Sequence, residues 1–256
     1  MITFKRATLV TGGSKRIGKA IITRLAKDNT NVVIHYNKSK SAALALSEKI
    51  NRNTKIKSIT VQADLNRSDQ IKSLFSIIKK KSFVIDCLIN NASAFNYDNL
   101  YSVSKKSWDK HVIPNLYAPL MLSKEFVSRL PSQLEGNIIN ILDQRVLNLT
   151  PHFLSYTVSK SGLWSLTKTL ALELAPKIRV NAIGPGPTIK SKFQTEKEFK
   201  LQCKSLPLQK GADPEHVAEA VIFFLKIKSI TGQMIALDGG QHLGWGQVKK
   251  NNKVLD

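Results

Sequence analysis

The sequence is short of cysteine, of acidic residues and of long apolar runs. Only two of its 256 residues are cysteine, Cys87 and Cys203, and they lie far apart without a Cys-x-x-Cys spacing. A disulfide framework is therefore excluded, and Met1 leads almost directly into a first strand, so we expect a cytoplasmic protein without a signal peptide. No segment approaches the roughly twenty apolar residues of a membrane-spanning helix. The five histidines show no metal-ligand spacing, so no metal is expected.

Acidic residues are outnumbered by basic ones. Thirty-nine Lys and Arg residues stand against eighteen Asp and Glu residues, which gives a formal net charge of +21. Such a charge would suit nucleic acid or another polyanion, but the lysines are scattered, many of them on the expected outer faces of helices. We therefore expect a solubilising surface and no specific nucleic-acid partner. The positive field should still assist the capture of an anionic cofactor.

The apolar pattern alternates between strands and helices along the chain. Segments rich in apolar residues at 7–10, 31–35, 56–61, 84–89, 137–142, 178–183 and 233–237 predict strands, and the one at 84–89 is almost continuously apolar. Helical periodicity between them predicts helices, including 41–51, 67–80, 108–129, 153–175 and 214–225. This alternation predicts an α/β fold, a single Rossmann-type domain with a doubly wound parallel sheet and helices on both faces. We assign the domain to residues 1–244 and a basic C-terminal tail to 245–256.

The first predicted strand runs into a glycine-containing turn and then a helix. The turn reads Thr11-Gly12-Gly13-Ser14-Lys15-Arg16-Ile17-Gly18. Free backbone N–H groups at a helix N-terminus bind the phosphates of a dinucleotide, although a tight turn without a ligand has the same sequence pattern. The ordinary fingerprint has three glycines, and here Arg16 takes the place of a middle one.

The end of the second predicted strand bears on the choice of cofactor. The stretch His35-Tyr36-Asn37-Lys38-Ser39 contains no acidic residue to bind the ribose hydroxyls of NAD. Lys15, Lys38 and Ser39 supply cations and a hydroxyl that would suit a 2′-phosphate, so NADPH is favoured over NADH. The alternative is an ordinary polar loop.

Tyr156 and Lys160 stand four residues apart in a segment of helical periodicity. They share one face of the expected helix, so the ammonium should favour the phenolate and lower the pKa of Tyr156 from about 10 towards neutrality. Tyr156 would then be a usable proton donor near pH 7. Taken alone, this spacing also occurs by chance on solvated helix faces.

Taken together, the motifs resemble those of the short-chain dehydrogenase/reductase family over nearly the whole chain. The resemblance rests on Thr11 to Gly18, Asn90-Asn91-Ala92-Ser93, Asn115, Tyr156-x-x-x-Lys160 and Pro185-Gly186. Within the family the chain looks most like the pteridine reductases. The residues that carry this closer likeness are Lys15-Arg16, His35 to Ser39, Ser93, Phe95 and Asp143, the last at a position usually held by a catalytic serine.

The resemblance implies roles for individual residues. The catalytic set would be Asp143, Tyr156, Lys160 and Asn115, with Asn115 holding a water beside the lysine. The substrate set would be Arg16, Ser93, Phe95, Asp143 and Tyr156, with Phe95 stacking a pterin ring against the nicotinamide. The cofactor set would be Gly12, Ser14, Lys15, Arg16, Ile17, His35, Tyr36, Asn37, Lys38, Ser39, Asp64, Leu65, Asn91, Ala92, Ser93, Tyr156, Lys160, Pro185 and Gly186.

Several of these residues also admit structural readings. Asp64 would meet the adenine by resemblance, but it could equally cap the helix at 67–80. Phe95 could cap the core, and Asp143 could be a turn residue after a strand. A carboxyl group at 143 nevertheless suits the several donors of a pterin better than a carbonyl oxygen. The stretch 189–204 is polar with few anchors, and we expect a mobile substrate lid there.

Three functions follow, in different classes. The first is an NADPH-dependent reductase of a pterin such as dihydrobiopterin, dihydromonapterin or dihydrofolate, with Tyr156 as proton donor. The second is an NADPH-dependent carbonyl reductase of the 3-oxoacyl or ketosteroid kind. The third is a non-catalytic protein that binds nucleotides or polyanions. By resemblance, the helices at 108–129 and 153–175 would form the interface of a homotetramer, with Trp164 and Leu166 among the candidate contacts.

Overall fold

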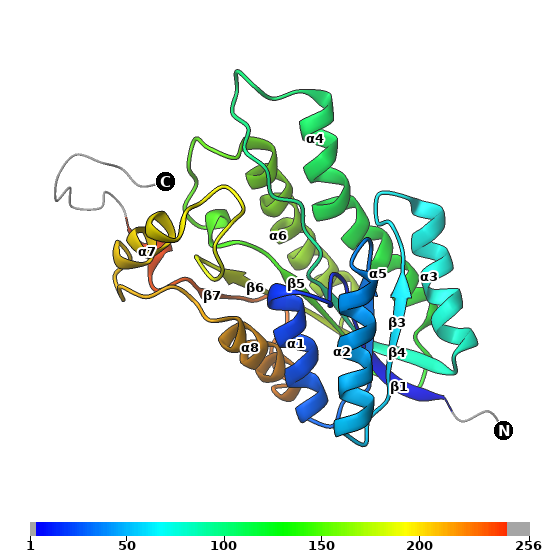
Figure 1. Cartoon of the computed structure of the whole chain (residues 1–256). Helices are drawn as coiled ribbons and strands as arrows, with labels where there is room; N and C mark the ends of the chain where they lie inside the picture. Colours follow the sequence, from blue (N-terminus) through cyan, green and yellow to red (C-terminus); the bar gives the residue numbers. More distant parts are fainter. Residues whose placement is uncertain (1–3, 245–256) are drawn as a thin grey trace.

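Seven parallel strands form one sheet in the computed structural model, which describes residues 4–244 (Figure 1). They lie in the order β3-β2-β1-β4-β5-β6-β7. Their bounds are β1 Lys5–Val10, β2 Val32–Tyr36, β3 Ser58–Gln62, β4 Phe83–Asn90, β5 Gly136–Ile141, β6 Ile178–Pro185 and β7 Met234–Leu237. The predicted fold class is confirmed, and each predicted strand is present with ends that differ by a few residues.

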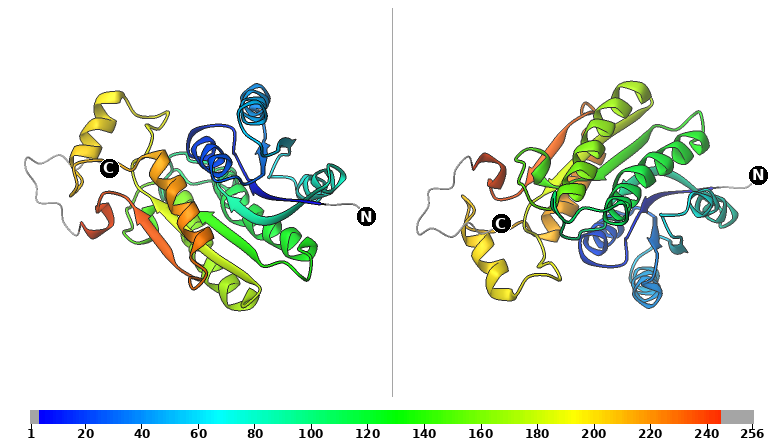
Figure 2. Two further views of the ribbon diagram at one scale, coloured as in Figure 1. Left: turned by 90° about the horizontal axis from the view of Figure 1, so that it is seen from below. Right: turned by 90° about the horizontal axis from the view of Figure 1, so that it is seen from above.

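Helices cover both faces of the sheet (Figure 2). They are α1 Arg16–Lys27, α2 Lys40–Asn53, α3 Ser68–Lys80, α4 Lys105–Val112, α5 Ala118–Arg129, α6 Leu154–Leu174, α7 Glu196–Lys204 and α8 Pro214–Lys226. Helices α1, α2 and α8 pack on one core cluster, whereas α3, α5 and α6 pack on the other. Within residues 4–244 no helix has the length and apolar character needed to cross a membrane.

The central strands are apolar because helices bury both of their faces. Residues Leu9 and Val10 of β1 and Leu88 and Ile89 of β4 have no exposed surface. Alternate residues of each strand point to opposite faces, so Leu9 and Leu88 belong to one core cluster and Val10 and Ile89 to the other. This explains why these strands are nearly continuous apolar runs in the sequence.

The direction of the chain across the sheet reverses between β1 and β4. The chain proceeds outward from β1 through β2 to β3, and then returns to the other side of β1 with β4. In such sheets a crevice opens at the carboxyl ends of the strands where the order reverses, and ligands bind there. Here that edge carries Thr11, after β1, and Asn91, after β4. The Thr11 hydroxyl accepts from the Asn91 N–H at 2.9 Å, and the Asn91 side-chain amide donates to the Thr11 carbonyl at 2.8 Å.

The expected helix at 108–129 is interrupted in the middle. Its α4 and α5 parts are joined by a π-helical turn at Ile113–Tyr117, so the irregularity lies before Pro119 rather than at it. Proline lacks an N–H and crowds the carbonyl four residues earlier, which for Pro119 is Asn115, inside this turn. The wider π turn accommodates both effects, and such turns are frequent at functional sites.

The polar stretch 189–204 is more ordered than the sequence predicted. Residues Glu196–Lys204 form helix α7, which begins with a capping box in which the Thr195 and Glu198 side chains each accept from the other's backbone N–H. The prediction that this stretch has few anchors is confirmed, because none of its residues is buried. Its mobility stays a prediction. The basic tail at 245–256 lies outside the described residues.

Candidate active site

A cavity of about 700 Å³ opens at the carboxyl edge of the sheet, beside the point where the strand order reverses. Its walls come from the glycine turn after β1, the segment after β4, the end of β5, the start of α6 and the segment after β6. Of the proposed site residues, those that line it are Gly12, Lys15, Arg16, Ile17, Asn91, Ala92, Ser93, Phe95, Asp143, Tyr156, Lys160, Pro185 and Gly186. The fold therefore brings most of the predicted site into one space.

The glycine turn approaches the segment after β4 too closely to carry side chains. Gly12 has a φ of +61°, and a Cβ there would lie 3.2 Å from the Cα of Ala92. A Cβ on Gly18 would lie 2.3 Å from the Gly12 carbonyl oxygen. Arg16 adopts a φ of +51°, a conformation that favours glycine and is costly for a long side chain. The backbone at Arg16 thus has the conformation that a middle glycine would adopt, and the residue also places a guanidinium at the cavity.

His35 contacts the backbone of the glycine turn and does not line the cavity. Its Nδ1 accepts from the Gly12 N–H at 3.1 Å, and its Nε2 lies 3.0 Å from the Ala63 carbonyl oxygen. Because Gly12 can only donate and Ala63 can only accept, the ring must be neutral with its proton on Nε2. Burial lowers the pKa of His35 to about 4, which agrees with this neutral form. The His35 side chain thus orders the turn, and its contact with a cofactor stays a prediction.

The remaining residues of the predicted adenosine side lie outside this cavity. The Tyr36 side chain packs in the core, while Asn37 and Lys38 are exposed and Ser39 immediately precedes α2. Asp64 is half-buried and Leu65 is buried. Both follow β3, at the same edge of the sheet as Lys38. Ser14 lines a second hollow of about 550 Å³ between α1 and α2, beside Lys15 and Arg16.

Asp64 does not cap the following helix. Helix α3 begins at Ser68, and no side chain caps its N-terminus. The Asp64 carboxylate instead accepts from the backbone N–H of Asn66 at 3.0 Å and from the Asn66 side chain at 2.7 Å. The capping alternative is therefore wrong.

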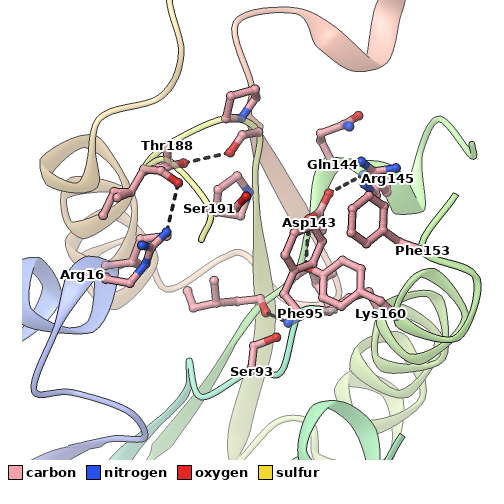
Figure 3. Close-up of a pocket in the computed structure, with 18 of the residues that line it drawn as sticks. Arg16, Ser93, Phe95, Asp143, Gln144, Arg145, Phe153, Lys160, Thr188 and Ser191 are labelled. Carbon is pink, nitrogen blue, oxygen red and sulfur yellow. Dashed lines mark hydrogen bonds between the residues drawn. The ribbon is translucent and has the colours of Figure 1, made fainter. Parts of the chain in front are cut away.

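Asp143, which is labelled in Figure 3, is hydrogen-bonded directly to Tyr156 in the wall of the cavity. Asp143 follows β5, and its Oδ2 accepts from the Tyr156 hydroxyl at 2.8 Å. Its Oδ1 accepts from the Arg145 N–H at 2.9 Å, which fixes the carboxyl plane. Tyr156 and Lys160 follow on the first turns of α6, and both are buried, with 5% and 2% of their surfaces exposed.

The expected effect of Lys160 on Tyr156 is wrong. The Lys160 ammonium donates to the Ile141 carbonyl at 2.8 Å and lies 5.8 Å from the centre of the tyrosine ring. Burial, followed by the negative charge of Asp143 and its hydrogen bond, raises the pKa of Tyr156 well above its usual value. Burial also lowers the pKa of Lys160 to about 8. The site therefore holds a neutral phenol against a carboxylate acceptor.

Asn115 is saturated with protein partners. Its Oδ1 accepts from the Ala94 N–H at 2.8 Å, and its Nδ2 donates to the Ala94 carbonyl at 3.0 Å and to the Ser159 hydroxyl at 3.1 Å. The Ser93 hydroxyl also donates to Oδ1, at 3.2 Å. With these bonds made, the side chain holds the segment after β4 to α6, and it is fully buried away from the cavity.

Phe95 meets an aromatic partner that no sequence motif identified. Its ring stacks on Phe153 with centroids 4.5 Å apart and meets Tyr156 edge-on at 4.7 Å. Phe153 precedes α6 with a φ of +58°, and this left-handed backbone turns its ring towards the cavity. Arg145 lies over the far side, with its guanidinium carbon 5.0 Å from the Phe153 centroid. Neither a lone aromatic before a helix nor an arginine after Asp143 carries a recognisable motif.

Arg16 reaches across the mouth of the cavity (Figure 3). Its guanidinium donates to the carbonyls of Ile189 at 2.9 Å and Lys190 at 3.1 Å, in the segment that follows β6. The same segment contributes Thr188, Ser191, Phe193 and Gln194 to the wall. Arg16, at the end of the glycine turn, therefore holds the start of the segment after β6 that forms part of the cavity wall.

Comparison with known proteins identifies the family. A family model described as enoyl-(acyl carrier protein) reductase matches residues 12–242. The chain belongs to the short-chain dehydrogenase/reductase family. Curated relatives of this reductase include glucose 1-dehydrogenase 2 of Bacillus subtilis (strain 168), 31% identical, with 93% of this chain and 95% of the relative covered. Another is the 3-oxoacyl-[acyl-carrier-protein] reductase FabG of Staphylococcus epidermidis, 30% identical over 93% of this chain and 99% of the relative.

Solved structures show a closer likeness. FolM alternative dihydrofolate reductase 1 from Brucella canis, complexed with NADP, is 42% identical with a TM-score of 0.88, and 96% of this chain and 97% of that chain are covered. The protein of the same description from Brucella suis, also in complex with NADP, is 42% identical with a TM-score of 0.91. Here 97% of this chain and 99% of that chain are covered.

The neutral form of His35 predicts a pH dependence of stability. The folded pKa of about 4 lies below the unfolded value of about 6.5, so the unfolded chain binds more protons between these pH values. Stability should fall as the pH drops from about 6.5 to 4, and His35 should contribute roughly 3 kcal/mol to that loss. The check is urea unfolding at pH 7 and pH 4.5 for the wild type and His35→Gln. The variant should lose part of the pH dependence, and exposed His216→Gln should retain it. An unchanged slope in His35→Gln would contradict the assignment.

Proposed function

We propose that this short-chain reductase is an NADPH-dependent pteridine reductase that acts on the C=N bond of a pterin. The observation that carries the proposal is the carboxylate of Asp143, 2.8 Å from the hydroxyl of Tyr156, at the inner end of the cavity. A fixed carboxylate suits a ring with several N–H donors, which a pterin has and a simple ketone lacks. The Brucella relatives described as alternative dihydrofolate reductases support the same choice.

The residues at the outer end of the cavity fit NADPH. The turn at Gly12 and Gly18 leaves no room for a Cβ, so backbone N–H groups can approach a diphosphate closely, at the N-terminus of α1. Lys15 and Lys38 would attract a 2′-phosphate, and the two Brucella relatives are complexes with NADP. When bound, NADPH would supply the hydride. Asn91, Ala92, Pro185 and Gly186 would border its nicotinamide.

Tyr156 is held ready to deliver the proton that the reaction also needs. Its raised pKa keeps the phenol protonated over the physiological range, and its O–H is aimed at the Asp143 carboxylate. Transfer of the phenolic proton to substrate would leave a phenolate beside the Asp143 carboxylate. The Lys160 ammonium, 5.8 Å from the centre of the tyrosine ring, would offset only part of that negative charge. Burial lowers the pKa of Lys160 to about 8, so the ammonium is mainly charged at pH 7.

A flat substrate ring finds an aromatic wall beside this proton donor. The stacked pair of Phe95 and Phe153 lies against Tyr156, and Arg145 covers the outer ring. A pterin ring on the free face of Phe95 would gain stacking and dispersion energy next to the donor. Ser93 and Arg16 would contribute polar contacts at the ring edges.

A carbonyl reductase is the second candidate, because curated relatives include a 3-oxoacyl-[acyl-carrier-protein] reductase. Reduction of a ketone develops negative charge on oxygen, and a carboxylate beside the proton donor would repel that charge. Asp143 therefore favours the pterin.

The function is tested by the specificity constants for dihydrobiopterin and for a 3-oxoacyl thioester with NADPH. Tyr156→Phe should cut pterin turnover by about a hundredfold while NADPH still binds. Asp143→Ser should lower the specificity constant for the pterin about tenfold, because its loss leaves ring donors unpaired at a cost of roughly 1–3 kcal/mol. The control Tyr101→Phe, at a fully exposed position, should behave as the wild type. Thioester turnover without pterin turnover by the wild type would defeat the proposal.

Cofactor choice gives a separate prediction. NADPH should bind about tenfold more tightly than NADH, a difference of about 1.4 kcal/mol, because no carboxylate follows β2 and two lysines are available. Lys15→Ala and Lys38→Ala should each weaken NADPH and leave NADH unchanged in a fluorescence titration. Lys72→Ala, on the exposed side of α3, serves as the control. Equal affinities of the wild type for the two cofactors would refute these assignments.

We further propose a cytoplasmic homotetramer. Trp164 and Leu166 are half-buried within one chain, but other apolar side chains on the π turn, α5 and α6 remain exposed. These are Tyr117, Leu120, Val158 and Leu172. Exposed apolar groups shared by neighbouring helices suit a two-fold interface.

Sedimentation at micromolar concentration tests the assembly. The wild type should sediment with the mass of four chains, and Leu172→Glu should shift it towards smaller species, since a carboxylate would be buried in the interface. Ile77→Glu on α3, outside the proposed surface, should leave the mass unchanged. A wild-type mass of one chain would contradict the proposal.

A further inference from the structure

The segment after β4 is held by side chains instead of by a neighbouring strand. Residues 91–99 form no helix or strand, yet from Ala92 to Asp98 the backbone is hydrogen-bonded at alternate residues. Ala94 exchanges two hydrogen bonds with the Asn115 side chain, and the Asn96 N–H donates to His111 Nε2 at 3.0 Å. His111 and Asn115 stand four residues apart on α4 and the π turn, so two adjoining helical turns serve as the partner.

The spacing of this contact follows from backbone geometry. Two residues of extended chain advance about 6.6 Å, and four residues of helix advance about 6 Å. Bonds at Ala94 and Asn96 can therefore match side chains at 115 and 111 without strain. In an extended chain successive side chains lie on opposite faces, so residues 95 and 97 share one face. Those residues are Phe95 and Tyr97, and both line the cavity.

His111 is also bonded on its second nitrogen. Its ring is fully buried, and Nδ1 lies 2.6 Å from the Ser155 hydroxyl oxygen. Since Asn96 N–H can only donate to Nε2, the ring proton must sit on Nδ1 and point at Ser155. The Ser155 hydroxyl then donates to Asp98 Oδ2. In this series of hydrogen bonds from Asn96 through His111 and Ser155 to Asp98, every donor faces an acceptor. That arrangement requires a neutral imidazole and an ionised Asp98.

The series of hydrogen bonds ends at Asp98, in the same segment 91–99 in which it began at Asn96. Asp98 Oδ1 accepts from the Ser155 N–H at 3.1 Å, and its backbone carbonyl accepts from the Leu154 N–H at 3.2 Å. Asp98 therefore caps helix α6, which begins at Leu154 and has no cap from its own preceding residue. Asn96 and Asp98 thus clamp the segment to α4 and to the first turn of α6, the turn that carries Tyr156.

We propose that His111 is a positioning residue. It orients the side chains of Phe95 and Tyr97 into the substrate cavity and fixes their position relative to Tyr156. Its ring lies edge-on to Tyr156 with centroids 5.9 Å apart, and Phe95 contacts the same tyrosine at 4.7 Å. Burial lowers the pKa of His111, although the neighbouring Asp98 acts in the opposite direction, and this agrees with the neutral ring. The effect on catalysis rests on the proposed pterin substrate, whereas the clamp itself does not.

Hydrogen exchange at the Asn96 amide tests the clamp without any substrate. His111→Gln keeps an acceptor near the place of Nε2, whereas His111→Asn keeps only a donor near the place of Nδ1. The Asn96 amide should stay protected in the wild type and in His111→Gln, and should exchange about tenfold faster in His111→Asn. Amides of β4 should be unaffected in all three proteins. Equal exchange of Asn96 in all three would overturn the clamp.

Kinetics test what the clamp does for catalysis. His111→Asn should raise KM for dihydrobiopterin about fivefold and lower kcat, with the Kd for NADPH within about twofold of the wild type. In a Phe95→Ala background the same substitution should have little further effect, because His111 acts through Phe95. Additive effects, or an equal loss of NADPH affinity, would show a merely structural role and overturn the proposal. Absence of pterin turnover by the wild type would instead refute the proposed substrate, while the exchange experiment still decides whether His111 holds the segment.

Discussion

The rest of the structure must hold Asp143 and Tyr156 in place, because the hydrogen bond between them joins groups from different elements of the fold. This bond joins the half-buried Asp143 carboxylate to the buried Tyr156 phenol, and the Lys160 ammonium is buried one helical turn further on, where an uncompensated charge would be costly. Strand β5 brings the carboxylate and helix α6 brings the other two groups, so strand and helix must be fixed to each other. A buried bond from the Asn140 side chain to the Thr167 hydroxyl, at 2.9 Å, joins them directly.

Much of this arrangement could be predicted from the sequence. Buried parallel strands are apolar runs, and their carboxyl ends all meet at one edge of the sheet. Residues directly after a predicted strand, such as Gly12, Asn91 and Asp143, were therefore expected near one another, and the structure places them around one cavity. The helices were less well predicted. The π turn has a weak sequence signal, whereas α7 was missed although Thr195 and Glu198 have the spacing of a capping box.

The electrostatics could not be predicted from spacing. Tyr156 and Lys160 share a helix face, but the ammonium is taken up by the Ile141 carbonyl, and a carboxylate thirteen residues earlier in the chain reaches the phenol instead. The direction of the tyrosine pKa shift was reversed for this reason. Phe153 and His111 were missed for a related reason. Their roles depend on a left-handed backbone and on the path of an irregular segment, and neither leaves a periodic pattern.

Fold similarity alone would not separate the possible reactions, since reductases and dehydrogenases of different substrates share this sheet and this Tyr-x-x-x-Lys pair. The possible reactions are distinguished by Asp143, the side chain that faces the proton donor Tyr156. A hydroxyl there can donate to a developing oxyanion, whereas an ionised carboxyl can only accept. Because both Asp143 oxygens already accept bonds from the protein, the carboxyl plane is fixed before substrate arrives. A ring that presents N–H donors in that plane is favoured by this geometry, and a ketone oxygen is disfavoured by the same charge.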